Sequence, residues 1–83
     1  MNRYFVYGRP DCPFCVKALE HLSNAKCEYL FIDVSGDADF ERHAKDFYGH
    51  PTVPMILSND KNSGRCVFIG GSDALEGHLK DGT

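Results

Sequence analysis

The sequence predicts an α/β fold, with a four-stranded mixed sheet flanked by three helices in the order β-α-β-α-β-β-α. Over the first two thirds of the chain, apolar runs of strand length alternate with segments of helical periodicity. This alternation is typical of parallel strands joined by crossover helices. In the last third, two apolar runs are joined by residues 58–65, which are rich in Asn, Asp, Ser and Gly. Such a connection favours an antiparallel hairpin, so the sheet is expected to be mixed.

The first three elements form a predicted β-α-β unit. Residues 4–7 are a continuous apolar run that ends at Gly8, as expected of a buried strand. Pro13 suits the first position of a helix, because its missing N–H would have no partner there. The helical pattern fades near residues 24–26, and residues 28–32 provide the second strand. The apolar residues that repeat at helical spacing are Cys15, Leu19 and Leu22.

A second helix is expected to open at residues 35–37, with Asp37 and Asp39 in its first turn and Gly49 as its stop. Its predicted apolar face consists of Phe40, Ala44 and Phe47.

The remaining elements are a hairpin and a short helix. The two strands of the hairpin are predicted at residues 55–57 and 66–69. A last helix is expected at about residues 73–80, capped by Ser72 or Asp73. Its side chains that should face the core are Leu75 and Leu79.

Length and composition restrict the class of protein. The 83 residues suit one domain, 1–83, and we expect a monomer. The formal net charge is −3 and the nine basic residues are scattered, which argues against binding to nucleic acid. The apolar run after residues 1–3 is too short for a signal peptide, and no segment reaches the length of a membrane span. We therefore expect a cytoplasmic protein that does not bind membranes.

The most informative motif is Cys12-Pro13-Phe14-Cys15 at the start of the first helix. Unpaired N–H groups and the helix dipole stabilise a thiolate at this place, so Cys12 is predicted to be the attacking nucleophile. Cys15, one turn into the helix and facing the core, should stay protonated until it acts as the resolving thiol. Asp11 opposes thiolate formation at Cys12, because its carboxylate carries like charge.

The other cysteines and the histidines are assigned no chemistry. Cys27 and Cys66 lie in or beside apolar runs and are expected to be small core residues. A second CxxC is missing, so half of a zinc site is the weaker interpretation of Cys12 and Cys15, and we expect no metal. His50 is the exception among the histidines, since it precedes Thr52 by two residues and its charge would act near the predicted site.

Four local signatures together resemble the dithiol glutaredoxins of the thioredoxin fold. They occur in that family's order and spacing, so the resemblance covers nearly the whole chain. The signatures are Tyr7-Gly8-Arg9 before the CPFC motif, Thr52-Val53-Pro54, Gly70-Gly71, and Ser72-Asp73 at the last helix.

The resemblance implies a glutathione site. Arg9 would lie near the thiolate and bind a carboxylate of glutathione. Phe14 would wall the thiol groove, although family members commonly carry Tyr there. Thr52, Val53 and a cis Pro54 would present the backbone of Val53 to the cysteine of glutathione. At the other end, Gly71, Ser72 and Asp73 would receive the γ-glutamyl group.

The expected function is glutathione-dependent reduction of protein–glutathione mixed disulfides and protein disulfides. Glutathione would be the reducing cosubstrate, no cofactor would be tightly bound, and ribonucleotide reductase is one protein partner that the family suggests. Two alternatives stay open. One is a thioredoxin-like reductase recharged by a flavoprotein; the other is a dimer that binds a [2Fe–2S] cluster through Cys12 and glutathione, against which Pro13 argues by resemblance.

Overall fold

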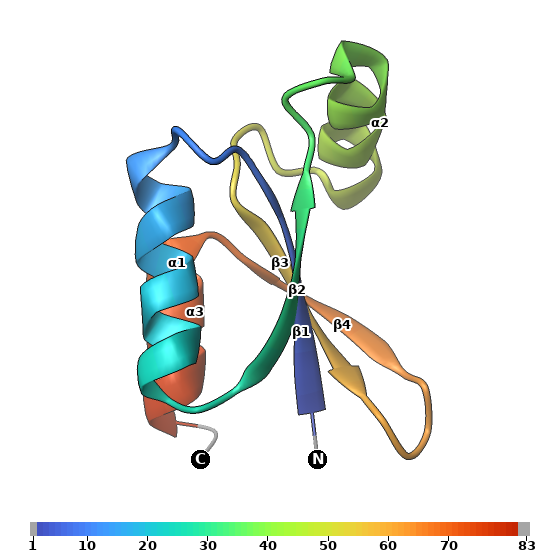
Figure 1. The fold of residues 1–83 in the computed structure, drawn as a ribbon. Coiled ribbons are helices and arrows are strands. Elements are labelled where there is room, and N and C mark those ends of the chain that lie inside the picture. Colours follow the sequence, from blue (N-terminus) through green and yellow to red (C-terminus); the bar gives the residue numbers. More distant parts are fainter. Residues whose placement is uncertain (1, 82–83) are drawn as a thin grey trace.

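The computed structural model describes residues 2–81, so residues 1 and 82–83 of the expected domain lie outside it. The predicted order of seven elements is confirmed. The elements are β1 (Asn2–Gly8), α1 (Pro13–Asn24), β2 (Glu28–Asp33), α2 (Ala38–Tyr48), β3 (Met55–Asp60), β4 (Cys66–Gly70) and α3 (Ser72–Asp81). Figure 1 shows them arranged around one twisted sheet.

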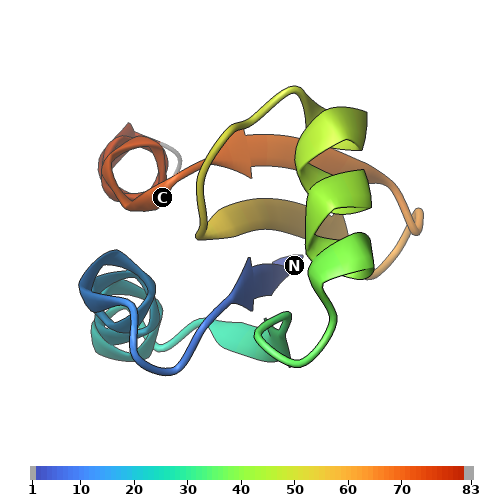
Figure 2. The same ribbon diagram turned by 90° about the horizontal axis from the view of Figure 1, so that it is seen from above.

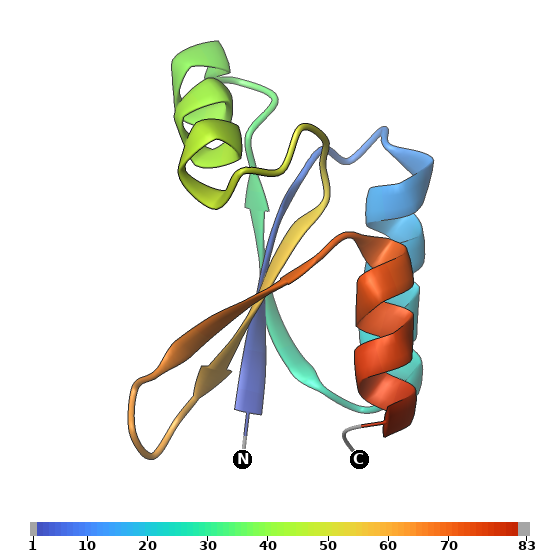
Figure 3. The ribbon, with the colours of Figure 1, turned by 180° about the vertical axis from the view of Figure 1, so that it is seen from behind.

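The sheet is mixed, with strand order β2-β1-β3-β4. β1 pairs in parallel with β2 and antiparallel with β3, and β4 completes the hairpin with β3. Helices α1 and α3 lie side by side on one face of the sheet, and α2 lies on the other, as Figure 2 shows from above. The view from behind in Figure 3 shows that α2 lies beyond one end of the sheet, where β1 leads into α1. The CPFC motif therefore lies at the same end of the molecule as α2.

The ends of the first two helices follow from local capping. Cys12 is the N-cap of α1 and Pro13 follows it in the first turn. The Asp37 carboxylate accepts a hydrogen bond from the Phe40 backbone N–H at 2.9 Å, which caps α2. Gly49 ends α2 with a φ of 63°, a left-handed conformation that glycine adopts without a Cβ clash.

The core lies between the sheet and the pair α1 and α3. Alternate residues of β1, Tyr4 and Val6, face these helices, because successive side chains of a strand point to opposite faces. They pack with side chains from both helices and from β3. The buried members of this cluster are Tyr4, Val6, Ala18, Leu22, Ile56 and Leu75.

On the opposite face of the sheet, three residues that were expected to be buried are exposed. Phe47 is 81% exposed and Phe40 is 41% exposed, so of the predicted face of α2 only Ala44 is buried. The ring of Tyr48 stacks on Phe68 at 4.9 Å and the ring of Phe40 lies 5.9 Å from that of Tyr7, whereas the ring of Phe47 lies against Tyr48 of α2 itself. Cys66 is exposed on β4, so it is not a core residue.

Several boundaries also differ from the prediction. β1 begins at Asn2, two residues early, and α2 begins at Ala38, so Asp37 is its cap and lies before its first turn. β3 continues through Asp60, and the buried Asn59 accepts a hydrogen bond from Arg3 at 2.8 Å. α3 begins one residue early, because the carbonyl of Gly71 accepts from the Leu75 N–H at 3.0 Å. Ser72 and Asp73 therefore lie inside the first turn of α3 and do not cap it. Among residues 2–81, no helix has the length and apolar character that crossing a membrane requires.

Candidate active site

Cys12 occupies the N-terminal end of α1 with its thiol turned back over the first turn. Its backbone is extended, and Sγ accepts a hydrogen bond from the Cys15 N–H at 3.4 Å. The side chain is half-buried, so the sulfur is reachable from solvent. A half-exposed sulfur at the start of a helix is well placed to meet a substrate disulfide.

Cys15 lies in a different environment, although only one turn separates the two thiols. Its side chain is completely buried and lies against Gly8, and its Sγ accepts a hydrogen bond from the Arg9 N–H at 3.5 Å. Burial, followed by the hydrogen bond with Cys12 and the charge of Cys12, raises the pKa of Cys15 to about 12. Cys15 therefore stays protonated at neutral pH while Cys12 is accessible.

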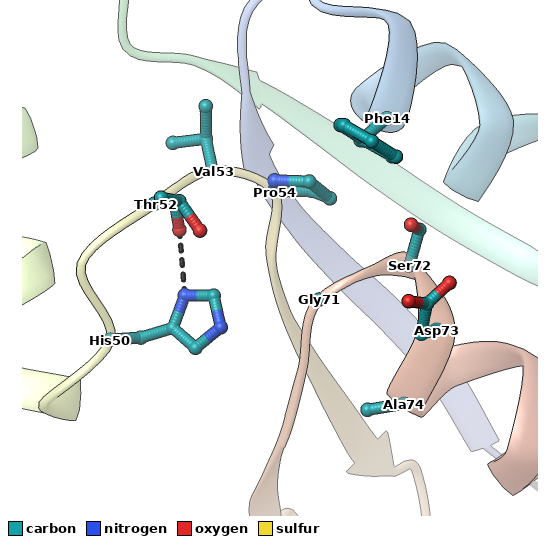
Figure 4. Close-up of a pocket in the computed structure, with 9 residues that line it drawn as sticks. All are labelled: Phe14, His50, Thr52, Val53, Pro54, Gly71, Ser72, Asp73 and Ala74. Carbon is teal, nitrogen blue, oxygen red and sulfur yellow. Dashed lines mark hydrogen bonds between the residues drawn. The ribbon is translucent and has the colours of Figure 1, made fainter.

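A hollow of about 510 Å³ opens between the loop before β3 and the start of α3. Figure 4 shows Phe14 of α1 with Ser72 and Asp73 of α3 on one side, and Thr52 and Val53 on the other. The Val53–Pro54 peptide bond is cis, as the resemblance implied. The full lining consists of Phe14, His50, Thr52, Val53, Pro54, Gly71, Ser72, Asp73 and Ala74.

His50 holds one wall of this hollow. Its ring Nδ1 lies 2.6 Å from the carbonyl oxygen of Thr52, close enough to donate a hydrogen bond to it (Figure 4). The other ring nitrogen faces Gly71, where a Cβ would lie 3.8 Å from it. A Cβ at Gly71 would therefore make ordinary van der Waals contact with the His50 ring.

The first turn of α3 supplies the polar end of the hollow. Ser72 is buried and Asp73 is exposed. N–H groups in the first turn of a helix lack intrahelical partners and attract carboxylates. Beside them, the Asp73 carboxylate suits an ammonium group.

A second hollow, of about 430 Å³, lies on the other side of Thr52 and Val53. Both hollows include these two residues, so they meet at the loop before β3. Within the described residues, the N–H and C=O of Val53 take no part in backbone hydrogen bonds. The lining of the second hollow is Arg9, Asp11, Cys12, Glu41, Lys45, Pro51, Thr52 and Val53.

Glu41 and Lys45 were not predicted as site residues. The Glu41 carboxylate forms ion pairs with Arg9 and with Lys45, whose Nζ lies 2.6 Å from Oε2. Both bonds, that of Lys45 first, hold the pKa of Glu41 below its ordinary value. Glu41 and Lys45 are four residues apart on a helix, a spacing that predicts an ion pair between them. Nothing in the sequence indicates the contact with Arg9, which is 32 residues away.

The structure brings every predicted site residue except the buried Cys15 to the lining of these two hollows. Cys15 lies beneath Cys12, and Cys27 and Cys66 line neither hollow. In the part of the chain that the structure describes, no three His, Cys, Asp or Glu residues are grouped as a metal site requires.

The chain is similar to known proteins in sequence and in fold. The family model that matches residues 4–62 is that of glutaredoxin. Glutaredoxin of Vibrio cholerae is 31% identical over 69 residues, which cover 75% of this chain and 79% of the relative. The solution structure of glutaredoxin from Brucella melitensis has a TM-score of 0.76 at 28% identity, and the match covers 96% of this chain and 80% of that one.

A complex of buckwheat glutaredoxin with glutathione has a TM-score of 0.77 at 21% identity, covering 98% of this chain and 71% of that one. This likeness shows a shared fold. The predicted thioredoxin fold is thus confirmed.

Proposed function

The chain belongs to the glutaredoxin family of thiol–disulfide oxidoreductases, and from this premise we propose that it reduces glutathione mixed disulfides with glutathione as its electron source. Cys12 is the proposed nucleophile, and Cys15 is the proposed resolving thiol. Glutathione is a cosubstrate in this proposal, with no tightly bound cofactor. Protein disulfides, such as that of a ribonucleotide reductase, are the second proposed class of substrate.

The observation that carries this proposal is the pair of hollows that meet at Thr52 and Val53 with Cys12 beside them. Glutathione has a cysteine in its middle, a carboxylate at its glycine end, and an ammonium and a carboxylate at its γ-glutamyl end. The lining offers matching groups in this order. Arg9 lies at one end, the unpaired backbone of Val53 in the middle, and the first turn of α3 with Asp73 at the other end.

The proposed reaction of a protein–glutathione mixed disulfide has two exchanges. The Cys12 thiolate attacks the glutathionyl sulfur, the old S–S bond breaks, and the protein thiolate leaves and takes up a proton. The thiolate of a second glutathione then attacks the glutathionyl sulfur on Cys12 and releases oxidised glutathione and Cys12. In sum, one free glutathione is consumed: its sulfur and the glutathionyl sulfur of the substrate form oxidised glutathione, and the protein sulfur is reduced to a thiol.

A protein disulfide follows a longer route. Attack by Cys12 forms a mixed disulfide with the protein, and Cys15 then displaces the protein thiol to form a Cys12–Cys15 bond. Two glutathione molecules reduce this bond in turn. The buried, protonated state of Cys15 supports this assignment, since Cys15 must lose its proton only when the mixed disulfide is in place.

The deciding experiment compares two electron sources. Turnover of a glutathionylated peptide is measured with glutathione, glutathione reductase and NADPH, and in parallel with thioredoxin reductase and NADPH alone. We expect rapid turnover only in the first assay. Turnover only in the second would overturn the glutathione site and favour a thioredoxin-like reductase that a flavoprotein recharges.

A further inference from the structure

We infer that Lys45 binds the carboxylate of the thiol ligand together with Arg9, and that Glu41 holds these two cations side by side at the Cys12 end of the groove. This inference rests on the proposed function and adds a specificity-determining residue to it. Lys45 lies on α2, a helix that carries none of the site residues predicted from the sequence.

The first argument is the sharing of one carboxylate by two cations. Oε1 of Glu41 pairs with Arg9 and Oε2 pairs with Lys45. Each cation uses one donor in these pairs. A guanidinium has five N–H donors and an ammonium has three, so both keep donors for a further anion.

The second argument is which of these groups faces solvent. The side chain of Glu41 is 7% exposed, whereas those of Arg9 and Lys45 are 44% and 30% exposed. The anion therefore lies beneath the two cations. A ligand that enters the hollow from solvent meets the cations first.

The third argument is the formal charge of the hollow. Apart from Cys12, its charged lining residues are Arg9, Asp11, Glu41 and Lys45, whose formal charges sum to zero; a Cys12 thiolate adds one negative charge. Without Lys45 the two carboxylates would outweigh Arg9, and the hollow would repel an anionic ligand. A carboxylate site at this place therefore requires Lys45 as well as Arg9.

The fourth argument is position. The hollow that Lys45 lines also contains Cys12 and Val53. A ligand whose sulfur meets Cys12 and whose cysteine backbone pairs with Val53 can extend its next residue toward Arg9 and Lys45. In glutathione the next residue is the C-terminal glycine.

The test measures the second-order rate constant at which an excess of reduced protein takes the glutathionyl group from a fluorescent peptide and leaves the peptide thiol. Two probes are used: a glutathionylated peptide, and the same peptide carrying glutathione whose glycine carboxylate is an amide. The wild type should prefer the carboxylate probe. Lys45→Gln should lower the rate constant for that probe by about threefold to tenfold, because a partly exposed charge–charge contact is lost. It should leave the amide probe unchanged.

Two further variants serve as controls. Lys80 forms the same kind of pair, four residues after Glu76, with Nζ and Oε2 3.7 Å apart, on α3. Lys80→Gln removes one positive charge and one helix pair without touching the groove, so it should retain the wild-type rate with both probes. Lys45→Arg keeps the charge and should retain most of the preference for the carboxylate probe.

The outcomes separate this inference from the proposed function. If the wild type leaves the glutathionylated peptide intact, the proposed function fails. If the wild type is fast but treats both probes alike, or if Lys45→Gln behaves like Lys80→Gln, the assignment of Lys45 is wrong. The comparison of probes on the wild type needs no variant, so equal rates with the two probes would overturn the inference even if Lys45→Gln folds poorly.

Discussion

The thiol of Cys15 lies directly against Gly8, where β1 ends. A Cβ at Gly8 would lie 2.7 Å from Sγ of Cys15 and 3.2 Å from the ring of Phe31. Real Cβ atoms do not approach a sulfur this closely, so the absence of a side chain at Gly8 lets the first turn of α1 reach the sheet. This contact accounts for the complete burial of the resolving thiol.

Gly8→Ala should therefore destabilise the protein by about 1–3 kcal/mol, as an added methyl group does in a filled core. The thiol of Cys15 and the Phe31 ring must both move. Urea unfolding of the reduced protein measures the effect. Gly36→Ala is the matched control, because nothing lies within 4 Å of a Cβ at Gly36. Equal stability of the two variants would contradict the close contact.

The high pKa of Cys15 predicts a loss of stability in alkaline solution. Burial raises this pKa from 9.0 to about 12, so the folded state keeps the proton that the unfolded chain releases. The stabilisation is fully present below pH 9 and is lost as pH rises from 9 towards 12. The free energy of unfolding of the reduced wild type should fall more steeply across this range than that of Cys15→Ala. Parallel slopes would show that Cys15 is not the group responsible.

The proposed roles of the two thiols predict that substituting one or the other has different effects on activity. Cys12→Ser should abolish the reduction of both glutathionylated peptides and protein disulfides, since it removes the nucleophile. Cys15→Ser should keep the first activity and lose the second, because only protein disulfides need a resolving thiol. Both activities are followed through NADPH consumption with glutathione and glutathione reductase. An equal loss of both activities in Cys15→Ser would refute the assigned roles.

The exposure of Phe47 predicts that its ring contributes little to folding. Its side chain is 81% exposed, and its ring lies against that of Tyr48, at 4.9 Å between ring centroids. Phe47→Ser should change the free energy of unfolding by less than about 1 kcal/mol. Leu75→Ala, in contrast, should cost about 2–5 kcal/mol, because Leu75 is completely buried. Chemical denaturation compares the two, and a cost for Phe47→Ser as large as that of Leu75→Ala would mean that α2 packs differently.

Local signals explain why the order of elements could be predicted. Pro13 starts α1, Asp37 caps α2 and Gly49 ends it, each through geometry that involves only neighbouring residues. The same is true of the CPFC motif, whose spacing alone places Cys12 at the N-cap and Cys15 one turn later. The family resemblance then placed the remaining candidate residues, all of which line the two hollows.

Burial on the second face of the sheet could not be predicted in this way. Periodicity shows that Phe40 and Phe47 share a stripe with Ala44, but it does not show how much of that stripe another element covers. Because α2 lies at one end of the sheet, the stripe is only partly covered and Phe47 stays exposed (Figure 3).

The sequence by itself thus determined the elements, their order and the thiol chemistry, because caps, apolar spacing and the CxxC motif act over a few residues. Only the tertiary structure decided that Glu41 joins Arg9 to Lys45 and that Gly8 receives Cys15. Those contacts depend on where α2 lies relative to β1 and on how closely α1 approaches the sheet. Such distances result from the packing of the whole chain, which no short segment specifies.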